Sequence, residues 1–283
     1  MANLDITNDE NLTSNSAPST SDRLLLIKAS TGELQDITVG ALMGTPSLDG
    51  WIAGSGTWSY SSADSPTFVI SINADVTALI GVGDRIKLTQ TTTKYFIVTA
   101  VGSFSGGVTL VTVYGGTDYT LANAAISSPY YSHAKAPFGF PLDPAKWTIT
   151  FTDTTNRSQA TPTAGTYYNL GSESLAIHIG AWKVELQCLA GVTDNSATAN
   201  SVRVALSTAN NSASDNSMLA QVTVAGASGN LIAISTVALG RFLTLVSKTT
   251  YYINVACTIA GAESIDFYNA TSTMTLRAIC AYL

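Results

Sequence analysis

The sequence feature that most restricts the fold is a series of short runs rich in β-branched and aromatic residues. Four of them precede residue 115, at Thr67–Ile72, Asp84–Gln90, Lys94–Val101 and Val108–Tyr114, and residues such as Gly, Asp, Ser and Thr separate them. Such regular spacing is typical of a small antiparallel barrel or sandwich. β-Branched and aromatic side chains also suit a pleated surface. The sequence therefore predicts an all-β chain.

The charge content agrees with this prediction and excludes several other classes of protein. Only 11% of the residues are charged, against about 25% in typical domains. A helical bundle would need more Glu, Lys and Arg on its exposed faces. The chain has 13 basic and 19 acidic residues, a net charge of −6, which disfavours a nucleic-acid binder. No stretch approaches the ~20 apolar residues of a membrane span, so we expect no membrane insertion.

The first residues and the cysteines indicate where the protein folds. The opening MANLDITNDE is acidic and polar and lacks the features of a signal peptide, which predicts folding in a cytoplasm. Cys188, Cys257 and Cys280 are widely spaced and lie in apolar runs. We expect buried thiols that behave as small hydrophobic groups. A metal site would need close Cys/His pairs, so none is predicted.

Residues 1–50 form the first of three zones and predict an extended N-terminal anchor with a short hairpin. Residues 1–22 are polar, with little apolar surface. Arg23–Lys28 and Leu34–Val39 then form two predicted strands around a turn at Ser30–Glu33. A lone hairpin is marginal in water. We expect the segment to gain order from a surface to which it docks; a flexible leader is the alternative.

Residues 51–141 form the second zone, a small β-barrel or sandwich module. Trp51 and Trp58 flank its Gly-rich opening. Its end is Pro-rich, with Ser128–Tyr131 followed by Pro137–Pro144. Proline restricts the backbone, so this end is predicted to be a semi-rigid connector, with residues 142–146 joining the third zone.

Residues 147–283 form the third zone, predicted to be a jelly-roll-like sandwich of eight to ten strands. Trp182–Cys188 alternates apolar and polar residues, as a half-buried strand does. Tyr251–Ile259 and Ala278–Leu283 are apolar on both faces, so we expect another subunit to cover their outer faces. The candidate strands are Trp147–Thr152, Leu175–Ile179, Trp182–Leu189, Ser201–Ser207, Met218–Val224, Leu231–Leu239, Arg241–Leu245, Thr250–Ile259, Ser264–Tyr268 and Met274–Leu283.

The sequence offers no motif of an enzyme, so we expect no catalytic activity and no cofactor. His133 and His178 are the only histidines, and His178 lies in an apolar strand, which favours a structural role. Gly102–Gly106 resembles a nucleophile elbow but has Phe where the serine should be. Glycoside hydrolysis needs a carboxylate pair, and most acids here lie at predicted turns. The oxygen-rich loops at Asp194–Asn195 and Ser214–Asn216 lack the calcium-loop spacing.

Adjacent aromatic residues suggest binding surfaces instead. Neighbours in a strand point to opposite faces, so one ring of a pair can enter a core while the other faces a partner or a sugar. Tyr167 and Tyr168 lie in a loop-like stretch beside Gly165 and Asn169. We expect packing in the core or an interface for this pair, and contact with a host surface glycan is the alternative.

Several stretches resemble parts of known families. Gly56–Pro141, with GTWSYSSADSPTFVI and VGDRIKLTQTTTKYFIVTAV, resembles a β-rich module of bacteriophage and prophage virion proteins. The third zone, with Ile179–Trp182, Tyr251–Val255 and Arg277–Leu283, resembles the trimeric C1q/TNF-like jelly rolls. The hairpin Leu24–Val39 resembles the short anchor repeats of phage tail-fibre proteins. No collagen stalk precedes the jelly roll, which sets the chain apart from secreted C1q relatives.

These resemblances imply a non-enzymatic structural protein of a tailed-phage virion, assembled in the bacterial cytoplasm. We expect a homotrimeric short fibre or spike, bound to other virion proteins through its N-terminus, with host-glycan contact at its tip. A capsid decoration or head-fibre protein is the alternative; a glycan depolymerase or a bacterial surface adhesin is weaker. The implied virion anchor is Leu24, Leu25, Leu26, Ile27, Leu34, Ile37 and Val39, and the implied trimer interface is Tyr251, Ile253, Val255, Ile279, Tyr282 and Leu283.

Overall fold

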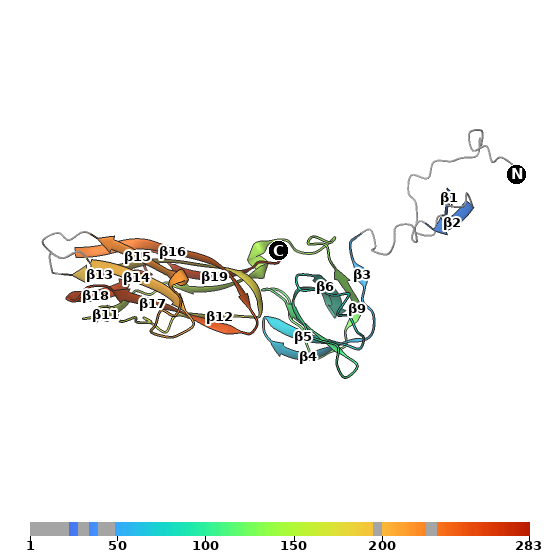
Figure 1. Cartoon of the computed structure of the whole chain (residues 1–283), viewed down its shortest axis with the longest axis horizontal. Helices are drawn as coiled ribbons and strands as arrows, with labels where there is room; N and C mark the ends of the chain where they lie inside the picture. The colour runs from blue at the N-terminus through green and yellow to red at the C-terminus, as the bar shows by residue number, and fades with distance from the viewer. Residues whose placement is uncertain (1–22, 28–33, 39–48, 195–199, 225–230) are drawn as a thin grey trace, which may run out of the picture. The chain divides into compact units, whose positions relative to one another are not determined.

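The computed structural model describes residues 23–27, 34–38, 49–194, 200–224 and 231–283 (Figure 1). Within these residues the chain is all-β, as predicted: the regular elements are antiparallel strands and short 3-10 turns. None of the described segments contains a helix with the length and apolarity needed to span a membrane. The chain divides into two compact units, Met1–Ile52 and Ala53–Leu283.

The first unit contains the predicted hairpin strands. β1 (Arg23–Ile27) pairs antiparallel with β2 (Leu34–Thr38), with Arg23 opposite Thr38. This confirms both strands of the expected hairpin. The turn between them and Val39 lie outside the described residues.

A seven-stranded antiparallel sheet forms the module that follows. Its order is β3-β9-β6-β7-β8-β5-β4, an open sheet and not a closed barrel. The four predicted strands are confirmed. The prediction of a connector at Ser128–Tyr131 is wrong, because these residues lie in β9, which pairs with β6. The strands are β3 (Ile52–Ala53), β4 (Trp58–Asp64), β5 (Thr67–Ile72), β6 (Arg85–Gln90), β7 (Thr92–Val101), β8 (Thr109–Tyr114) and β9 (Ser127–Ser132).

The remaining strands form a jelly-roll sandwich. One sheet contains the order β10-β19-β13 with β16 on the other side of β13, and the second has the order β12-β17-β14-β15. Counting these eight strands along the chain, the sheets read 1-8-3-6 and 2-7-4-5, the double Greek key of a jelly roll. They are β10 (Thr148–Asp153), β12 (Ser174–Ile177), β13 (Gly180–Asp194), β14 (Asn200–Ser207), β15 (Leu219–Val224), β16 (Leu231–Leu245), β17 (Thr249–Cys257) and β19 (Met274–Cys280).

Two details of the sandwich differ from the sequence-based prediction. Leu231–Leu239 and Arg241–Leu245 are one continuous strand, β16, because the backbone at Gly240 stays in register with β13. The short strand β11 (Arg157–Ala160) was not expected; it pairs with β18 (Ala262–Phe267) at the edge of the first sheet.

An aromatic cluster joins the module to the sandwich. Tyr114 ends β8, and its ring lies edge-on to Trp182 of β13, with centroids 5.0 Å apart. Trp147 closes the 3-10 turn η2 (Pro144–Trp147) and stacks on Phe140 at 5.1 Å. The three rings Tyr114, Trp147 and Trp182 are fully buried. The Pro-rich connector therefore contributes to a shared core.

The expected covering of Tyr251–Ile259 by another subunit is wrong. Ile253 and Val255 have no exposed surface within the chain itself, and Tyr251 is also buried. These three side chains lie on the core face of β17. The other face is covered by the chain's own loops: Asn254 bonds to the carbonyls of Ala209 and Ser212. A predicted trimer contact through Tyr251, Ile253 and Val255 is therefore excluded in this conformation.

The other predicted interface residues are partly exposed to solvent. Ile279, Tyr282 and Leu283 are each half-buried. The carbonyl of Tyr282 accepts a hydrogen bond from Arg85, and that of Leu283 accepts one from Lys135. The last residues of the chain thus contact the β-module, whereas Ile279 lies on the outer face of the sandwich.

Candidate functional site

Each histidine is bound to a side chain of the module. Nδ1 of His178 lies 3.0 Å from Oγ1 of Thr67, and Thr67 in turn donates to the carbonyl of Asp64. His178 is buried, and burial lowers the pKa of its imidazole. Nδ1 of His133 lies 3.0 Å from Oδ2 of Asp84. The structural role expected for His178 fits this geometry, because it links the sandwich to β5.

The three cysteines are free and buried, as predicted. Burial raises the pKa of the Cys188 thiol to about 12 and that of Cys280 to about 11. Such thiols are poor nucleophiles.

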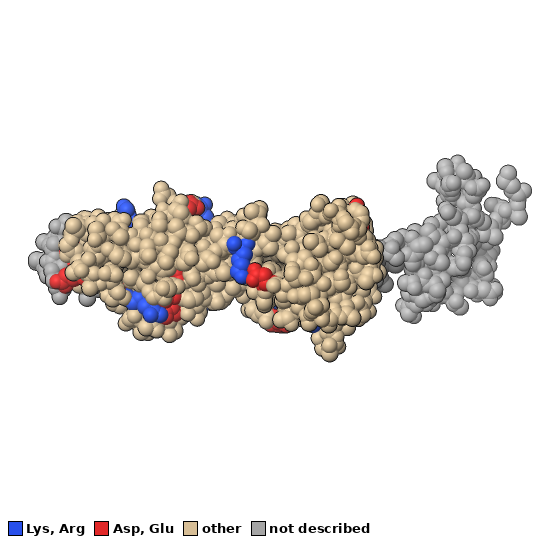
Figure 2. Space-filling view, turned by 90° about the horizontal axis from the view of Figure 1, so that it is seen from below, with Lys and Arg blue, Asp and Glu red and all other residues tan. Residues whose placement is uncertain are grey.

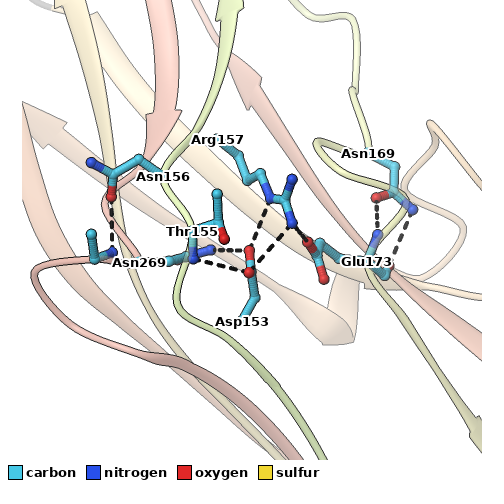
Figure 3. A network of polar contacts seen from close by, with 8 residues as sticks. Asp153, Thr155, Asn156, Arg157, Asn169, Glu173 and Asn269 are labelled. Atoms are coloured by element: carbon cyan, nitrogen blue, oxygen red, sulfur yellow. Dashed lines mark hydrogen bonds and ion pairs between the residues drawn. The ribbon is translucent and has the colours of Figure 1, made fainter.

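A pair of buried carboxyl groups forms the most unusual titratable cluster of the described chain (Figure 3). Asp153 ends β10, and Glu173 directly precedes β12. The guanidinium of Arg157 lies between them, with Nε 3.0 Å from Oδ2 of Asp153 and one terminal nitrogen 3.3 Å from Oε1 of Glu173. Asn269 donates to Asp153 at 2.7 Å, and its own Oδ1 is buried without a hydrogen-bond partner.

The two carboxyl groups titrate in opposite directions. Burial and the neighbouring Asp153 raise the pKa of Glu173 to about 7. The pKa of Asp153 falls to about 2: burial opposes this shift, but hydrogen bonds from Arg157, Thr155 and Asn269 outweigh it. One cation between two carboxyl groups holds one of them ionised and leaves the other protonated at acidic pH.

This cluster was missed in the sequence because its members come from separate segments. Asp153, Glu173 and Asn269 lie far apart along the chain and share no motif. Both carboxyl groups are also buried, with Asp153 8% and Glu173 3% exposed, whereas the side chain of Arg157 is 33% exposed. Gly171 packs directly on it, since a Cβ there would lie 2.7 Å from Arg157 Nε and from Glu173 Oε1. The arrangement suits a structural role, in which Arg157 links the end of β10 to the start of β12, rather than a substrate site.

The raised pKa of Glu173 predicts a loss of stability as pH rises from 4.5 to 7. In that range the unfolded chain has released the Glu173 proton and the folded chain retains it, so the free energy of unfolding falls with pH. We expect a fall on the order of 2 kcal/mol from this group. Glu173→Gln cannot ionise and should abolish this part of the slope, as measured by urea unfolding at a series of pH values.

Glu263→Gln is the matched control, because Glu263 is exposed on β18. It should keep the wild-type slope between pH 4.5 and 7. An unchanged slope in Glu173→Gln would show that Glu173 is not the titrating group.

The outer face of the first sandwich sheet is a candidate binding surface. Cross-strand partners share a face of the sheet, and the register gives three rows across β16, β13, β19 and β10. The side chains of these rows point outward, because the residues that alternate with them on β13, Trp182, Val184 and Leu186, are buried in the core. The rows are Phe242–Lys183–Ile279–Thr148, Gly240–Glu185–Arg277–Thr150 and Ala238–Gln187–Thr275–Thr152.

Two hollows mark this face. One, of about 330 Å³, lies over Gly240 and Ala238 and is bordered by Glu185, Gln187 and Arg277. The other, of about 360 Å³, lies between Arg277 and the start of β10. The first is open above Gly240, where a Cβ would meet no atom within 4 Å. Beside it, Phe242 is 73% exposed.

The predicted glycan contacts lie elsewhere, before β12. Tyr167 and Tyr168 are both half-buried. The backbone of Tyr168 bridges to Val255 of β17, and its hydroxyl accepts a hydrogen bond from the Thr163 amide at 3.0 Å. Glycan contact there stays a prediction.

The carboxylates of the oxygen-rich loops accept hydrogen bonds from neighbouring residues of the same chain. Asp215 accepts a hydrogen bond from the Ser217 amide, and Asp194 accepts one from the Asn200 side chain. The described residues hold no group of three His, Cys, Asp or Glu side chains arranged around a metal position.

Comparisons with known proteins identify no family for this chain. No family model matches the chain, and no curated protein sequence matches it. Weak structural similarity is found to a VP2 subviral particle of infectious bursal disease virus, with 10% identity over 84% of this chain and 79% of that chain, at a TM-score of 0.24. The Gt strain of the same virus gives 12% identity over 80% and 62%, at 0.25. Scores this low do not establish a common fold.

Proposed function

We propose that this chain is a non-enzymatic structural protein of a tailed-phage particle, a trimeric short fibre or spike. The observation that carries the proposal is the combination of a jelly roll with a separate N-terminal hairpin unit. Jelly rolls are common in viral capsid and lectin domains. The fold alone does not specify a function, so the surface of the protein must support the assignment.

The surface is suited to assembly. In Figure 2 most of the visible described surface carries neither Lys, Arg, Asp nor Glu. The outer sheet face has only Lys183, Glu185 and Arg277 as charged members of its three central rows. Lys183 and Glu185 already pair at 2.6 Å. A face with so little uncompensated charge can be buried against a partner at a small desolvation cost.

The N-terminal hairpin supports attachment to a larger particle. A two-stranded hairpin is marginal by itself, and the hairpin belongs to a compact unit separate from Ala53–Leu283. We infer that β1 and β2 dock on another virion protein. Three tethered hairpins per trimer would bind with an avidity that one does not reach.

The test is incorporation into particles of the phage that encodes the chain. Full-length protein should co-purify with the particles, and protein lacking residues 1–45 should fold but stay free, as measured by mass spectrometry of gradient-purified particles. Electron microscopy with a labelled chain then separates a tail position from a capsid decoration. Particles devoid of the full-length chain would refute the proposed function.

A further inference from the structure

The segment between β11 and β12, residues 161–173, follows the edge of β17 without regular strand structure. We call it the edge segment. Its backbone bonds to β17 at separate points: Tyr168 and Val255 exchange amide-to-carbonyl hydrogen bonds of 2.9 Å, and the amide of Gly165 donates to the carbonyl of Cys257 at 2.9 Å. A segment held by separate bonds, and not by a continuous ladder, can open locally while the sheets stay intact.

Glu173, the last residue of the edge segment, links it to the buried carboxyl cluster. The Ile253 amide of β17 donates to the carbonyl of Glu173 at 3.1 Å. The side chain of Asn169 accepts from the Glu173 amide at 2.7 Å and donates to its carbonyl at 3.1 Å (Figure 3). The Glu173 carboxyl lies 3.3 Å from the Arg157 guanidinium. The edge segment therefore stays in place only while the Glu173 side chain fits its buried position.

The charge of the cluster depends on the protonation of Glu173. Among the described residues, the charged groups that act on its carboxyl are Asp153 and Arg157. The neighbours that β17 and the loop after β18 contribute to the cluster, Ile253 and Asn269, are uncharged. With Glu173 protonated, one guanidinium balances one carboxylate. With Glu173 ionised, a second carboxylate is buried at 3% exposure without a second cation, which is unfavourable.

We propose that Asp153, Arg157 and Glu173 form a pH-sensitive switch that keeps the edge segment on β17 while Glu173 is protonated and releases it when Glu173 ionises. The inference goes beyond the proposed function and does not depend on it, because it concerns a single chain. Burial, a hydrogen bond to Asp153 and the charge of Asp153 raise the pKa of Glu173 to about 7, against the opposing effect of Arg157. Once the segment is released, water solvates the carboxyl group, and its pKa returns to the ordinary 4.5. The closed form is therefore fully stabilised below pH 4.5 and loses this stabilisation as the pH rises to 7.

Release of the edge segment changes two features of the surface. Tyr167 and Tyr168 lie in this segment and are half-buried, so they lose their fixed position when it opens. The backbone of β17 at Val255 loses its partner Tyr168, and an unpaired strand edge can accept another strand. The switch thus makes the tyrosine pair and this strand edge respond to pH.

Native-state hydrogen exchange of the full chain tests the switch. The reporters are the amides of Tyr168 and Val255, which bond to each other's carbonyls, and dividing each rate by the intrinsic rate at the same pH gives an opening constant. In wild type this constant should rise at least about tenfold between about pH 5 and about pH 8. It should depend little on added urea, because a local opening exposes little surface, whereas core amides of β13 should show the large urea dependence of global unfolding.

Glu173→Gln tests the group responsible. A neutral amide can donate to Asp153 as the protonated acid does and cannot ionise, so the opening constant should become independent of pH. Glu185→Gln is the matched control, because Glu185 lies on the outer sheet face beside Lys183, and this variant should keep the wild-type rise. Carbon-13 titration of the Glu173 carboxyl in wild type needs no variant, and its midpoint should coincide with the rise in opening.

Three results would overturn the switch. The first is an opening constant at Tyr168 and Val255 that does not change with pH. The second is a rise that has the same urea dependence as the amides of β13, which would assign it to global unfolding and not to the edge segment. The third is a rise that persists in folded Glu173→Gln, or a Glu173 titration whose midpoint differs from that of the opening. None of these results bears on the virion role, which the particle experiment tests separately.

Discussion

Replacing Trp147 with alanine should lower the free energy of unfolding by about 3–5 kcal/mol, the usual cost of truncating a buried large aromatic residue. Trp147 has no exposed surface. Its ring stacks on Phe140 at 5.1 Å and lies 6.0 Å from Tyr114, and its Nε1 donates to the carbonyl of Pro141. The variant loses the aromatic contacts and leaves a cavity where the module meets the sandwich.

Calorimetry and urea unfolding measure the effect. Because Trp147 belongs to the cluster shared by the module and the sandwich, the variant should also show two separated unfolding transitions where wild type shows one. Phe138→Ala is the control: Phe138 is 82% exposed, and a surface change of this kind should stay within about 0.5 kcal/mol. A single wild-type-like transition in Trp147→Ala would mean that other contacts couple the two parts.

Replacing Arg85 with methionine should destabilise the protein by about 3 kcal/mol, because it removes the charged donor of three hydrogen bonds to backbone carbonyl groups. Arg85 has no exposed surface. It donates to the carbonyls of Lys135 at 3.0 Å, Gly83 at 2.5 Å and Tyr282 at 2.8 Å. Methionine preserves most of the volume, so the loss reports the hydrogen bonds and not a cavity.

Hydrogen exchange locates the effect of the Arg85→Met substitution. The contact with Tyr282 holds the last residues against β6, and the amide of Ala281 bonds to the carbonyl of Ala181. Protection of Ala281 should fall sharply in the variant. Arg203→Met is the control, since the Nε of Arg203 bonds to the Gln221 side chain at a partly exposed position. Unaltered exchange at Ala281 would show that Arg85 does not fix the chain end.

The local pattern of the chain was sufficient to predict most strands. β13 contains the predicted Trp182–Leu189, because a period of two in side-chain polarity directly reflects a half-buried strand. β5 matches the predicted Thr67–Ile72, because β-branched and aromatic side chains suit a pleated surface. β9 was missed because Pro129 suggested a connector; in the structure this strand pairs with β6, at the side of the sheet next to the short edge strand β3. β11 was missed because its polar sequence, Arg157–Ala160, carries no strand pattern.

Exposure of individual faces was harder to predict. Two apolar faces on Tyr251–Ile259 suggested a partner subunit, but loops from the same chain cover the outer one. A strand's own sequence shows that a face must be covered and does not show by what. Ile253 and Val255 were misplaced as trimer contacts because they lie on the core face of β17, where the chain itself buries them.

The sequence by itself determined the all-β class and the positions of most strands, because these depend on neighbouring residues. Only the tertiary structure decided which segments meet. It brought Asp153, Arg157 and Glu173 into one cluster, joined Tyr114 to Trp182, and placed Phe242 beside the hollow over Gly240. These contacts depend on strand order and register, which long-range pairing across the whole jelly roll fixes and no local pattern encodes.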